Sequence, residues 1–186
     1  MLVLETSRLF IRPLAISDLE DVHRLHTDDL VVQSLFSGEP PSCENTQEKM
    51  KQYVREWRQN GFGFFGVFLK DSKELGEFAG RAGLRYFEDT THVEYGLCLF
   101  GHVAGRGIGP EVGRAILRFS FKELNLERVV AVIRPENKRS IRALGKIGFT
   151  HVEDREYGDH VKGFYEVCAT QYGIARQSGG TRAHTD

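Results

Sequence analysis

The chain has 186 residues, of which 40% are hydrophobic and 27% are charged, and its formal net charge is −1. These values are typical of one globular domain with a substantial apolar core. Because 25 Lys and Arg residues balance 26 Asp and Glu residues, broad binding to nucleic acid or to a membrane surface is not expected. No apolar run approaches the roughly 20 residues that a membrane-spanning helix needs. The three cysteines are widely spaced, which favours free thiols in a reducing, cytoplasmic setting.

Hydrophobic periodicity divides the chain into strands and helices. Ser17 and Glu20 have the spacing of a capping box, so a helix is expected to begin at Asp18, whereas segment 28–42 has only a weak pattern. The expected elements, in chain order, are a strand over 7–14, helices over 18–27 and 44–60, strands over 62–70, 74–87 and 93–100, a helix over 110–124, a strand over 128–134, a helix over 138–147, and strands over 150–157 and 163–171. Turns over 71–73 and 158–160 join two of the strand pairs. This order predicts one mixed α/β domain over 1–175, followed by a disordered polar tail over 176–186.

A glycine-rich segment lies after a predicted strand and opens a predicted helix; it consists of Gly105, Arg106, Gly107, Ile108 and Gly109. Helix N-termini expose unpaired N–H groups and a partial positive charge. Glycines let the backbone approach an anion, so this position suits a phosphate or pyrophosphate. The spacing G-x-G-x-G matches neither the dinucleotide-binding fingerprint nor a P-loop. Taken alone, the motif is equally consistent with a tight turn that binds nothing.

Several segments together, in this order, resemble the GNAT acetyltransferases, and in particular their RimJ/RimL-like branch, which includes ribosomal-protein N-terminal acetyltransferases. The resemblance covers about residues 2–172 and is carried by LETSRL (4–9), GEFAGRAGL (76–84), EYGL (94–97), GRGIGPE (105–111), PENKRSIR (135–142) and KIGF (146–149). It implies a GNAT-like α/β fold, with a central, largely antiparallel twisted sheet that is split between its fourth and fifth strands and flanked by helices.

The same resemblance implies that acetyl-CoA is the co-substrate and sits in this split. The residues implied to hold it are, for the pantetheine, the backbone of Leu97, Cys98 and Leu99; for the pyrophosphate, Gly105 to Gly109; and for the thioester end and the adenosine phosphates, Asn137, Ser140 and Arg142, with Arg139 as an alternative to Arg142. Three positions depart from the family pattern. Ala104 and Pro110 lack polar groups that many relatives carry there. Leu144 stands where other GNAT branches have a tyrosine general acid, so the departing thiolate needs another donor.

The resemblance also implies that Glu94 is the general base, acting through a water, and that Ser140 is the candidate proton donor. Judged without it, Glu94 is an ordinary strand carboxylate, and Ser140 and Asn137 satisfy backbone groups at a helix start. Cys98 lacks a Cys-His-acid arrangement and is interpreted as a core thiol. No metal site is expected, because the histidines lack ligand spacing.

The sequence therefore predicts an N-acetyltransferase that moves an acetyl group from acetyl-CoA to a primary amine by direct attack in a ternary complex. The acceptor is expected to be a protein N-terminus or a small-molecule amine, and the protein a monomer or homodimer. Polyamines and aminoglycoside-like amines are mildly disfavoured, because no acidic groove is evident. The alternative is a catalytically weak acyl-CoA-binding sensor or interaction module, which the departures at Ala104, Pro110 and Leu144 keep open.

Overall fold

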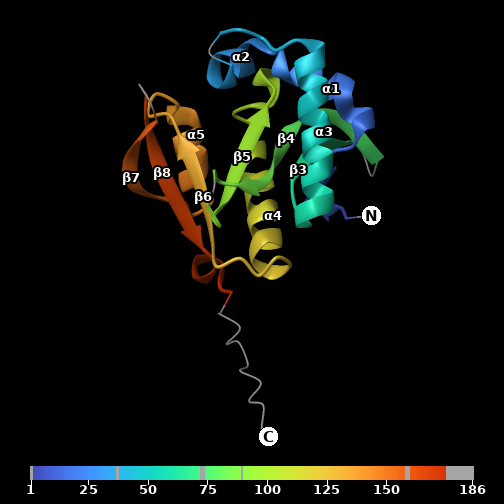
Figure 1. Cartoon of the computed structure of the whole chain (residues 1–186). Helices are drawn as coiled ribbons and strands as arrows, with labels where there is room; N and C mark the ends of the chain where they lie inside the picture. The colour runs from blue at the N-terminus through green and yellow to red at the C-terminus, as the bar shows by residue number, and fades with distance from the viewer. Residues whose placement is uncertain (1, 37, 72–73, 89, 158–159, 175–186) are drawn as a thin grey trace, which may run out of the picture.

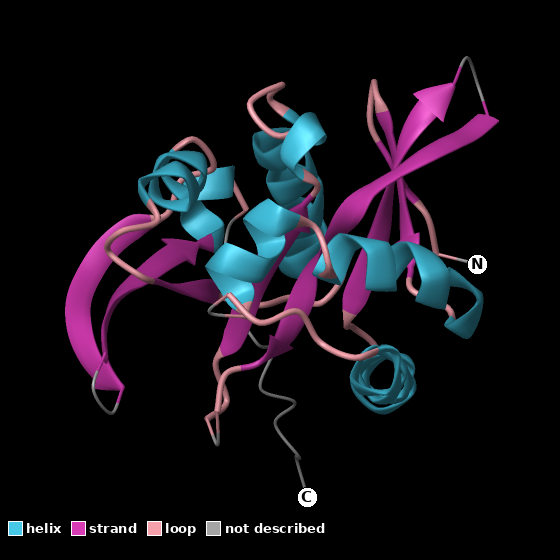
Figure 2. Cartoon of the chain, turned by 90° about the horizontal axis from the view of Figure 1, so that it is seen from above, coloured by secondary structure: helices cyan, strands magenta, loops and turns pink. Residues whose placement is uncertain are grey.

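Eight strands join one sheet, and helices lie on both of its faces (Figures 1 and 2). The computed structural model describes residues 2–36, 38–71, 74–88, 90–157 and 160–174. The strands are β1 (Leu4–Glu5), β2 (Leu9–Pro13), β3 (Phe64–Asp71), β4 (Glu74–Tyr86), β5 (Val93–Leu99), β6 (Arg128–Ile133), β7 (Thr150–Tyr157) and β8 (His160–Cys168). The helices are α1 (Leu19–His26), α2 (Asp29–Leu35), α3 (Cys43–Asn60), α4 (Ile108–Lys122) and α5 (Lys138–Gly145), with short 3-10 turns at Ile16–Asp18, Gly101–Val103 and Ala169–Tyr172.

The strand order is β1-β2-β3-β4-β5-β6-β8-β7, and every neighbouring pair is antiparallel except β5 and β6. Strands β4 and β5 pair along their length, from Gly80 opposite Leu99 to Tyr86 opposite Val93. Strands β5 and β6 share only the parallel bridge between Glu94 and Val130. The predicted split between the fourth and fifth expected strands, 93–100 and 128–134, is therefore confirmed. These strands are β5 and β6 in the structure, because the short strand β1 precedes the first expected strand. All strands that the structure describes join this one sheet.

The two faces of the sheet carry separate cores. Cross-strand partners point to the same face, so Phe64 and Cys98 both face α1 and α3, where they pack with Tyr53. Leu99 points to the opposite face and packs with Ile116 of α4. In Figure 1, α3 lies in front of β3 and β4, and α4 lies behind β5.

The predicted long helix over 44–60 is confirmed as α3. Ser42 caps it, because its hydroxyl oxygen accepts a hydrogen bond from the N–H of Asn45 at 3.1 Å. Gly61 follows the helix with φ of 73°, a conformation that favours glycine at this position. Helix α4 begins at Ile108, two residues before the prediction. Pro110 thus lies inside the first turn, where a missing N–H removes no hydrogen bond.

The beginning of α1 differs from the prediction. Ser17 does not cap the helix; a 3-10 turn over Ile16–Asp18 precedes α1 instead. The carboxylate of Asp18 accepts a hydrogen bond from the N–H of Ala15 at 2.8 Å. It also accepts hydrogen bonds from Nη1 and Nη2 of the Arg12 guanidinium. A buried ion pair therefore fixes this corner in place of the expected capping box.

The segment with the weak pattern contains α2, which the sequence did not predict. Its start is fixed by Asp28, whose carboxylate accepts a hydrogen bond from the N–H of Leu30 at 3.1 Å. Two turns are too short for a helical period to stand out. At the other end of the chain, β8 begins at His160, earlier than predicted, and Cys168 ends it. The predicted turns over 71–73 and 158–160 fall partly, and the predicted tail over 176–186 wholly, outside the described residues. None of the helices that the structure describes is long and apolar enough to cross a bilayer.

The Arg12–Asp18 pair makes a stability prediction. Arg12 donates to the two oxygens of Asp18 at 2.8 and 2.7 Å, and the Asp18 side chain is only 6% exposed. Removing one partner leaves a partly buried, unpaired charge, so Asp18→Ala should lower the free energy of unfolding by about 3 kcal/mol in urea denaturation. The matched control is Asp21→Ala, which removes the exposed pair with Arg24 and should cost less than about 1 kcal/mol. Equal losses in the two variants would contradict this account.

Candidate active site

A cleft of about 1700 Å³ opens on the α3 face of the sheet. Its walls come from α2, α3, β4, β5, β6 and the two strands of the β7–β8 hairpin. Of the predicted site residues, Glu94 and Asn137 line this cleft. The backbone segment 97–99 and the glycine segment 105–109 lie outside it, along and beyond the carboxyl end of β5. Glu94 and the backbone segment 97–99 therefore lie at opposite ends of β5.

Glu94 is held by an arginine on the neighbouring strand. It lies directly opposite Arg85, and its Oε2 accepts a hydrogen bond from Arg85 Nε at 2.6 Å. Burial acts to lower the pKa of Arg85, but the hydrogen bond to Glu94 leaves that pKa above its usual value. Glu94 is 6% exposed, and among the described residues its Oε1 receives no hydrogen bond. One oxygen is thus fixed, and the other remains available at the cleft.

The hydrogen-bond alternation of β4 and β5 decides which backbone groups face the split. Phe100 N–H donates to the carbonyl of Ala79 at 3.1 Å at one end of the pair, and Phe87 N–H donates to the carbonyl of His92 at 2.9 Å at the other. In an antiparallel pair, successive residues of a strand direct their backbone groups to opposite edges. Every second residue of β5, counting back from Phe100, therefore bonds to β4.

This alternation separates the three residues predicted to pair with pantetheine. The backbone groups of Leu97 and Leu99 point towards the split, where β6 has already diverged. Those of Cys98 bond to β4, opposite Arg81, so the predicted backbone role does not fit Cys98. Its side chain lies in the core under α1 and α3, and burial raises the pKa of the Cys98 thiol to about 11. The interpretation of Cys98 as a core thiol therefore agrees with its surroundings.

The glycine segment forms an open backbone cradle at the start of α4. Gly105 and Gly107 have φ of 84° and 81°, which L side chains rarely adopt. Within the described residues, the N–H groups of residues 105–109 donate to no acceptor. Unpaired N–H groups at a helix start attract an anion. The backbone of this segment therefore suits the pyrophosphate that the sequence predicted.

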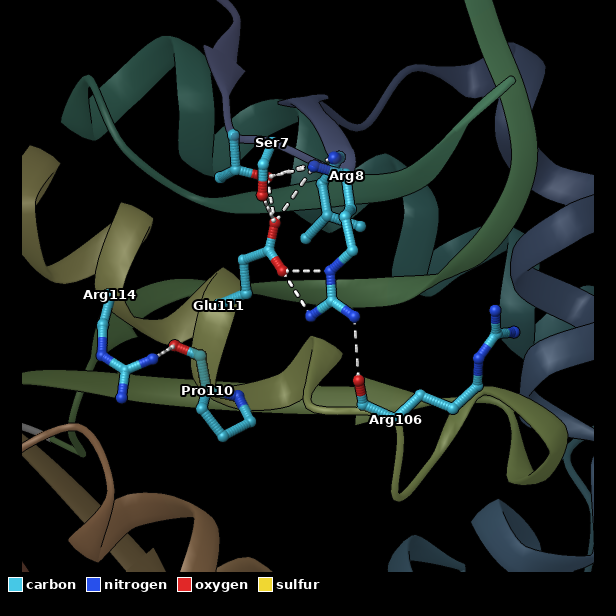
Figure 3. Close-up of polar contacts among 8 residues, drawn as sticks. Ser7, Arg8, Arg106, Pro110, Glu111 and Arg114 are labelled. Atoms are coloured by element: carbon cyan, nitrogen blue, oxygen red, sulfur yellow. Dashed lines mark hydrogen bonds and ion pairs between the residues drawn. The ribbon is translucent and has the colours of Figure 1, made fainter. Parts of the chain in front are cut away.

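An arginine from the start of β2 ties this cradle to the sheet (Figure 3). Arg8 Nη1 donates to the carbonyl of Arg106 at 3.0 Å, and Arg8 Nε donates to Glu111 Oε2 at 2.7 Å. Thr6 and the N–H of Arg8 bond to the other oxygen of Glu111. Burial opposes ionisation, but the hydrogen bonds from Thr6 and Arg8 hold the pKa of Glu111 below its usual value. A carboxylate in the first turn of α4 is thereby neutralised beside the candidate anion site.

The start of α5 has a cap that also borders the cleft. Asn137 Oδ1 accepts a hydrogen bond from the N–H of Ser140 at 3.1 Å, which confirms the capping interpretation of Asn137. Ser140 itself does not line the cleft, while Arg139 and Arg142 are exposed. Leu144 is 4% exposed and belongs to the core. The side chain at the position of the family tyrosine is therefore buried in the core.

Sequence reasoning missed several residues of the site. The contact of Arg8 with Glu111 joins positions more than a hundred residues apart, and no local pattern predicts it. Tyr157 lines the cleft; burial raises its pKa, and Glu94 is among the charges that add to the shift. Arg81 also lines the cleft. The position of each of these residues depends on how distant segments pack together, which a single sequence does not reveal.

Comparison with known proteins agrees with this geometry. Residues 8–150 match the family model described as "Acetyltransferase (GNAT) domain". The uncharacterized N-acetyltransferase YnaD of Bacillus subtilis (strain 168) is 29% identical over 163 residues, which cover 88% of this chain and 85% of that protein.

Two solved structures have the same fold. RimL, a ribosomal alpha-N-protein acetyltransferase solved with coenzyme A, superposes with a TM-score of 0.78 at 18% identity, over 90% of this chain and 98% of that one. The aminoglycoside acetyltransferase AAC(6')-Ib, solved with paromomycin and acetyl-CoA, superposes with a TM-score of 0.75 at 18% identity, over 91% and 98% of the two chains. With the family model spanning most of the chain and a sheet split beside an open glycine cradle, the chain belongs to the GNAT acetyltransferase family and is an N-acetyltransferase, as the sequence predicted.

Proposed function

We propose that this protein transfers an acetyl group from acetyl-CoA to a primary amine, which is a protein N-terminal α-amine or a small-molecule amine, by direct attack in a ternary complex. The observation that carries the proposal is the divergence of β5 from β6 after the single bridge at Glu94. On one side of this point lie free backbone groups and the open cradle. On the other side lies a cleft with Glu94 on its wall.

The cradle side suits the three parts of acetyl-CoA. The backbone of Leu97 and Leu99 would bond the amides of the pantetheine, as a further strand does at an open edge. The N–H groups of segment 105–109 would bind the pyrophosphate. Arg106, Arg139 and Arg142 would supply positive charge around the adenosine phosphates. Asn137 would donate a hydrogen bond from its side-chain amide to the thioester end of the ligand on the cleft side. Its Oδ1 already accepts the hydrogen bond of the helix cap.

Glu94 is proposed to take the proton that the acceptor amine must lose, through a water. A lysine-type amine has a pKa of about 10.4, and an α-amino group one of about 7.7–8.0, so a base is needed more by the first than by the second. Arg85 keeps the Glu94 carboxylate oriented, which makes Arg85 a positioning residue. The departing thiolate needs a proton, although a thiol pKa of about 8.5 makes this need smaller than that of an alkoxide. Ser140 is the proposed donor of that proton.

Two finer assignments are part of the proposal. The opening segment 4–9 and the glycine segment support placement in the RimJ/RimL-like branch. The three cysteines are free thiols, which supports a reducing, cytoplasmic setting. A weakly catalytic acyl-CoA sensor is the second candidate, favoured by the burial of Leu144 where a family tyrosine would act.

Replacement of the candidate base separates these two functions. Glu94→Gln should lower kcat roughly 10²-fold at neutral pH, measured as free thiol released from acetyl-CoA. The Kd for acetyl-CoA should change less than about twofold, because only the chemical step loses its base. The defect in kcat should shrink as the pH approaches the pKa of the acceptor amine, because more of the amine is then already deprotonated.

The matched control is Glu123→Gln, which alters an exposed carboxylate at the end of α4. Unchanged turnover in Glu94→Gln would rule out this role, and turnover too low to measure in the wild-type protein despite acetyl-CoA binding would favour the sensor.

The link between Arg8 and Glu111 predicts a defect confined to the nucleotide end of the ligand. Arg8→Ala would leave the Glu111 carboxylate unpaired beside the pyrophosphate and release the carbonyl of Arg106. We expect the Kd for acetyl-CoA to rise roughly tenfold, as for a lost charged hydrogen bond, with no change for acetyl-pantetheine, which lacks the pyrophosphate. The double variant Arg8→Ala/Glu111→Gln should recover part of the affinity, and Arg118→Ala, on the exposed side of α4, should have no effect. Equal losses for both ligands would contradict a role in holding the cradle.

A further inference from the structure

The acceptor side of the cleft contains an arginine that is held in position but forms no ion pair with a described residue. Arg81 lies on β4, on the same face as Arg85, and lines the cleft. Its guanidinium carbon is 4.8 Å from the centroid of the Phe64 ring and 5.5 Å from that of Tyr53. Arginine stacks on aromatic faces in this way, which restricts its motion.

The Nε atom of Arg81 is also held in place by a hydrogen bond. Arg81 Nε donates to His26 Nε2 at 3.2 Å. His26 is 2% exposed, and burial, aided by the charge of Arg81, lowers the pKa of His26 to about 3. His26 is therefore neutral at physiological pH and accepts the hydrogen bond without adding charge. The two terminal nitrogens of Arg81, which form the fork that binds carboxylates in pairs, have no acceptor among the described residues.

A second cation lies across the Tyr53 ring. Lys49 of α3 lines the same cleft, with Nζ 5.8 Å from the ring centroid. It donates to the uncharged Gln52 at 3.0 Å and forms no ion pair with a described residue. Burial lowers the pKa of Lys49, and the charges of Arg85 and Arg81 add to the shift. The positive groups therefore repel one another in the ligand-free protein.

The carboxylates nearby do not neutralise this cluster. Glu94 is paired with Arg85. Glu56 accepts from Gln52 at 2.7 Å through Oε1, and its Oε2 is buried without a hydrogen-bond partner. Glu56 acts on Lys49 only at longer range. Lys49, Arg81 and Arg85 thus lie near Glu56 and Glu94, while the whole cleft is lined by five Glu and five Lys or Arg residues. Arg81 is distinguished because its terminal nitrogens have no acceptor among the described residues.

We infer that the acceptor amine also carries a carboxylate, which Arg81 binds through its terminal nitrogens, with Lys49 beside it. This inference rests on the proposed function, which it narrows. Arg81 and Arg85 are four residues apart, or about 13 Å along a strand, and long side chains shorten that span. The amine would therefore lie near Glu94 and the carboxylate several bonds away, as in an ω-amino carboxylate. Polyamines and aminoglycosides, which bear further positive charge, are disfavoured as acceptors.

Matched pairs of acceptors test the inference. Free-thiol release would be measured with ω-amino carboxylates and α-amino acids against their carboxamides, which keep the amine and lose the charge. Aminoalkyl phosphates and a tripeptide with Asp at its second position identify the source of the anion. The wild-type protein should favour carboxylates over carboxamides at least about tenfold in kcat/KM, which is the usual size of a charged hydrogen bond. Arg81→Gln should abolish this preference, and Arg81→Lys should retain part of it.

The control variant is Arg24→Gln, which alters an exposed arginine of α1 and should keep the preference. Acetyl-CoA binding by each variant reports folding independently of the acceptor. Preference for the peptide with the same dependence on Arg81 would support the inference and assign the carboxylate to a protein. Equal use of carboxylates and carboxamides, or binding of acetyl-CoA with no acceptor of either class turned over, would overturn the inference. Failure to bind acetyl-CoA at all would instead reject the proposed function.

Discussion

The single bridge between β5 and β6 is the constraint on which the rest of the site depends. Strand β5 is fully paired with β4 on one edge, so its position is fixed. On the other edge, among the described residues, Glu94 alone is bridged, to Val130, and no described strand pairs with the backbone beyond it. Unpaired backbone groups away from bulk water are costly, which makes this edge a natural place for a ligand with amide groups.

Electrostatics then divides the molecule into two binding regions of different character. At the start of α4, backbone N–H groups attract anions, and the only acidic side chain of that first turn, Glu111, is neutralised by Arg8. At the acceptor end, side chains act instead of backbone. Arg85 is paired and orients Glu94, whereas Arg81 is stacked and pinned but unpaired. Groups that can bind an anion are therefore present in both regions, although the total charge of the chain is close to zero.

The sequence predicted more of the fold than of the site, for physical reasons. Long amphipathic helices, glycine stops and β-branched runs act locally, so α3, α4 and most strands were found within a few residues of their bounds. Helix α2 was missed because two turns show no clear period, and its cap at Asp28 was not recognised. Glu94 and the glycine segment came from motifs. The roles of Arg81 and Cys98 depend on which residues face one another across strands, and register is fixed only when the sheet forms. The role of Arg8 depends on a contact with α4 that forms only when the helix packs on the sheet.

Calorimetric titration with acetyl-CoA, run beside ATP and NAD, tests the central claim most directly, because it measures the cradle and the open edge of β5 without requiring the acceptor. Micromolar-range binding of acetyl-CoA, with much weaker binding of ATP and NAD, is the predicted result. Absence of acetyl-CoA binding by the folded protein, or equal affinity for ATP, would contradict the assignment of this split sheet to acetyl transfer and would leave the glycine segment as a structural turn.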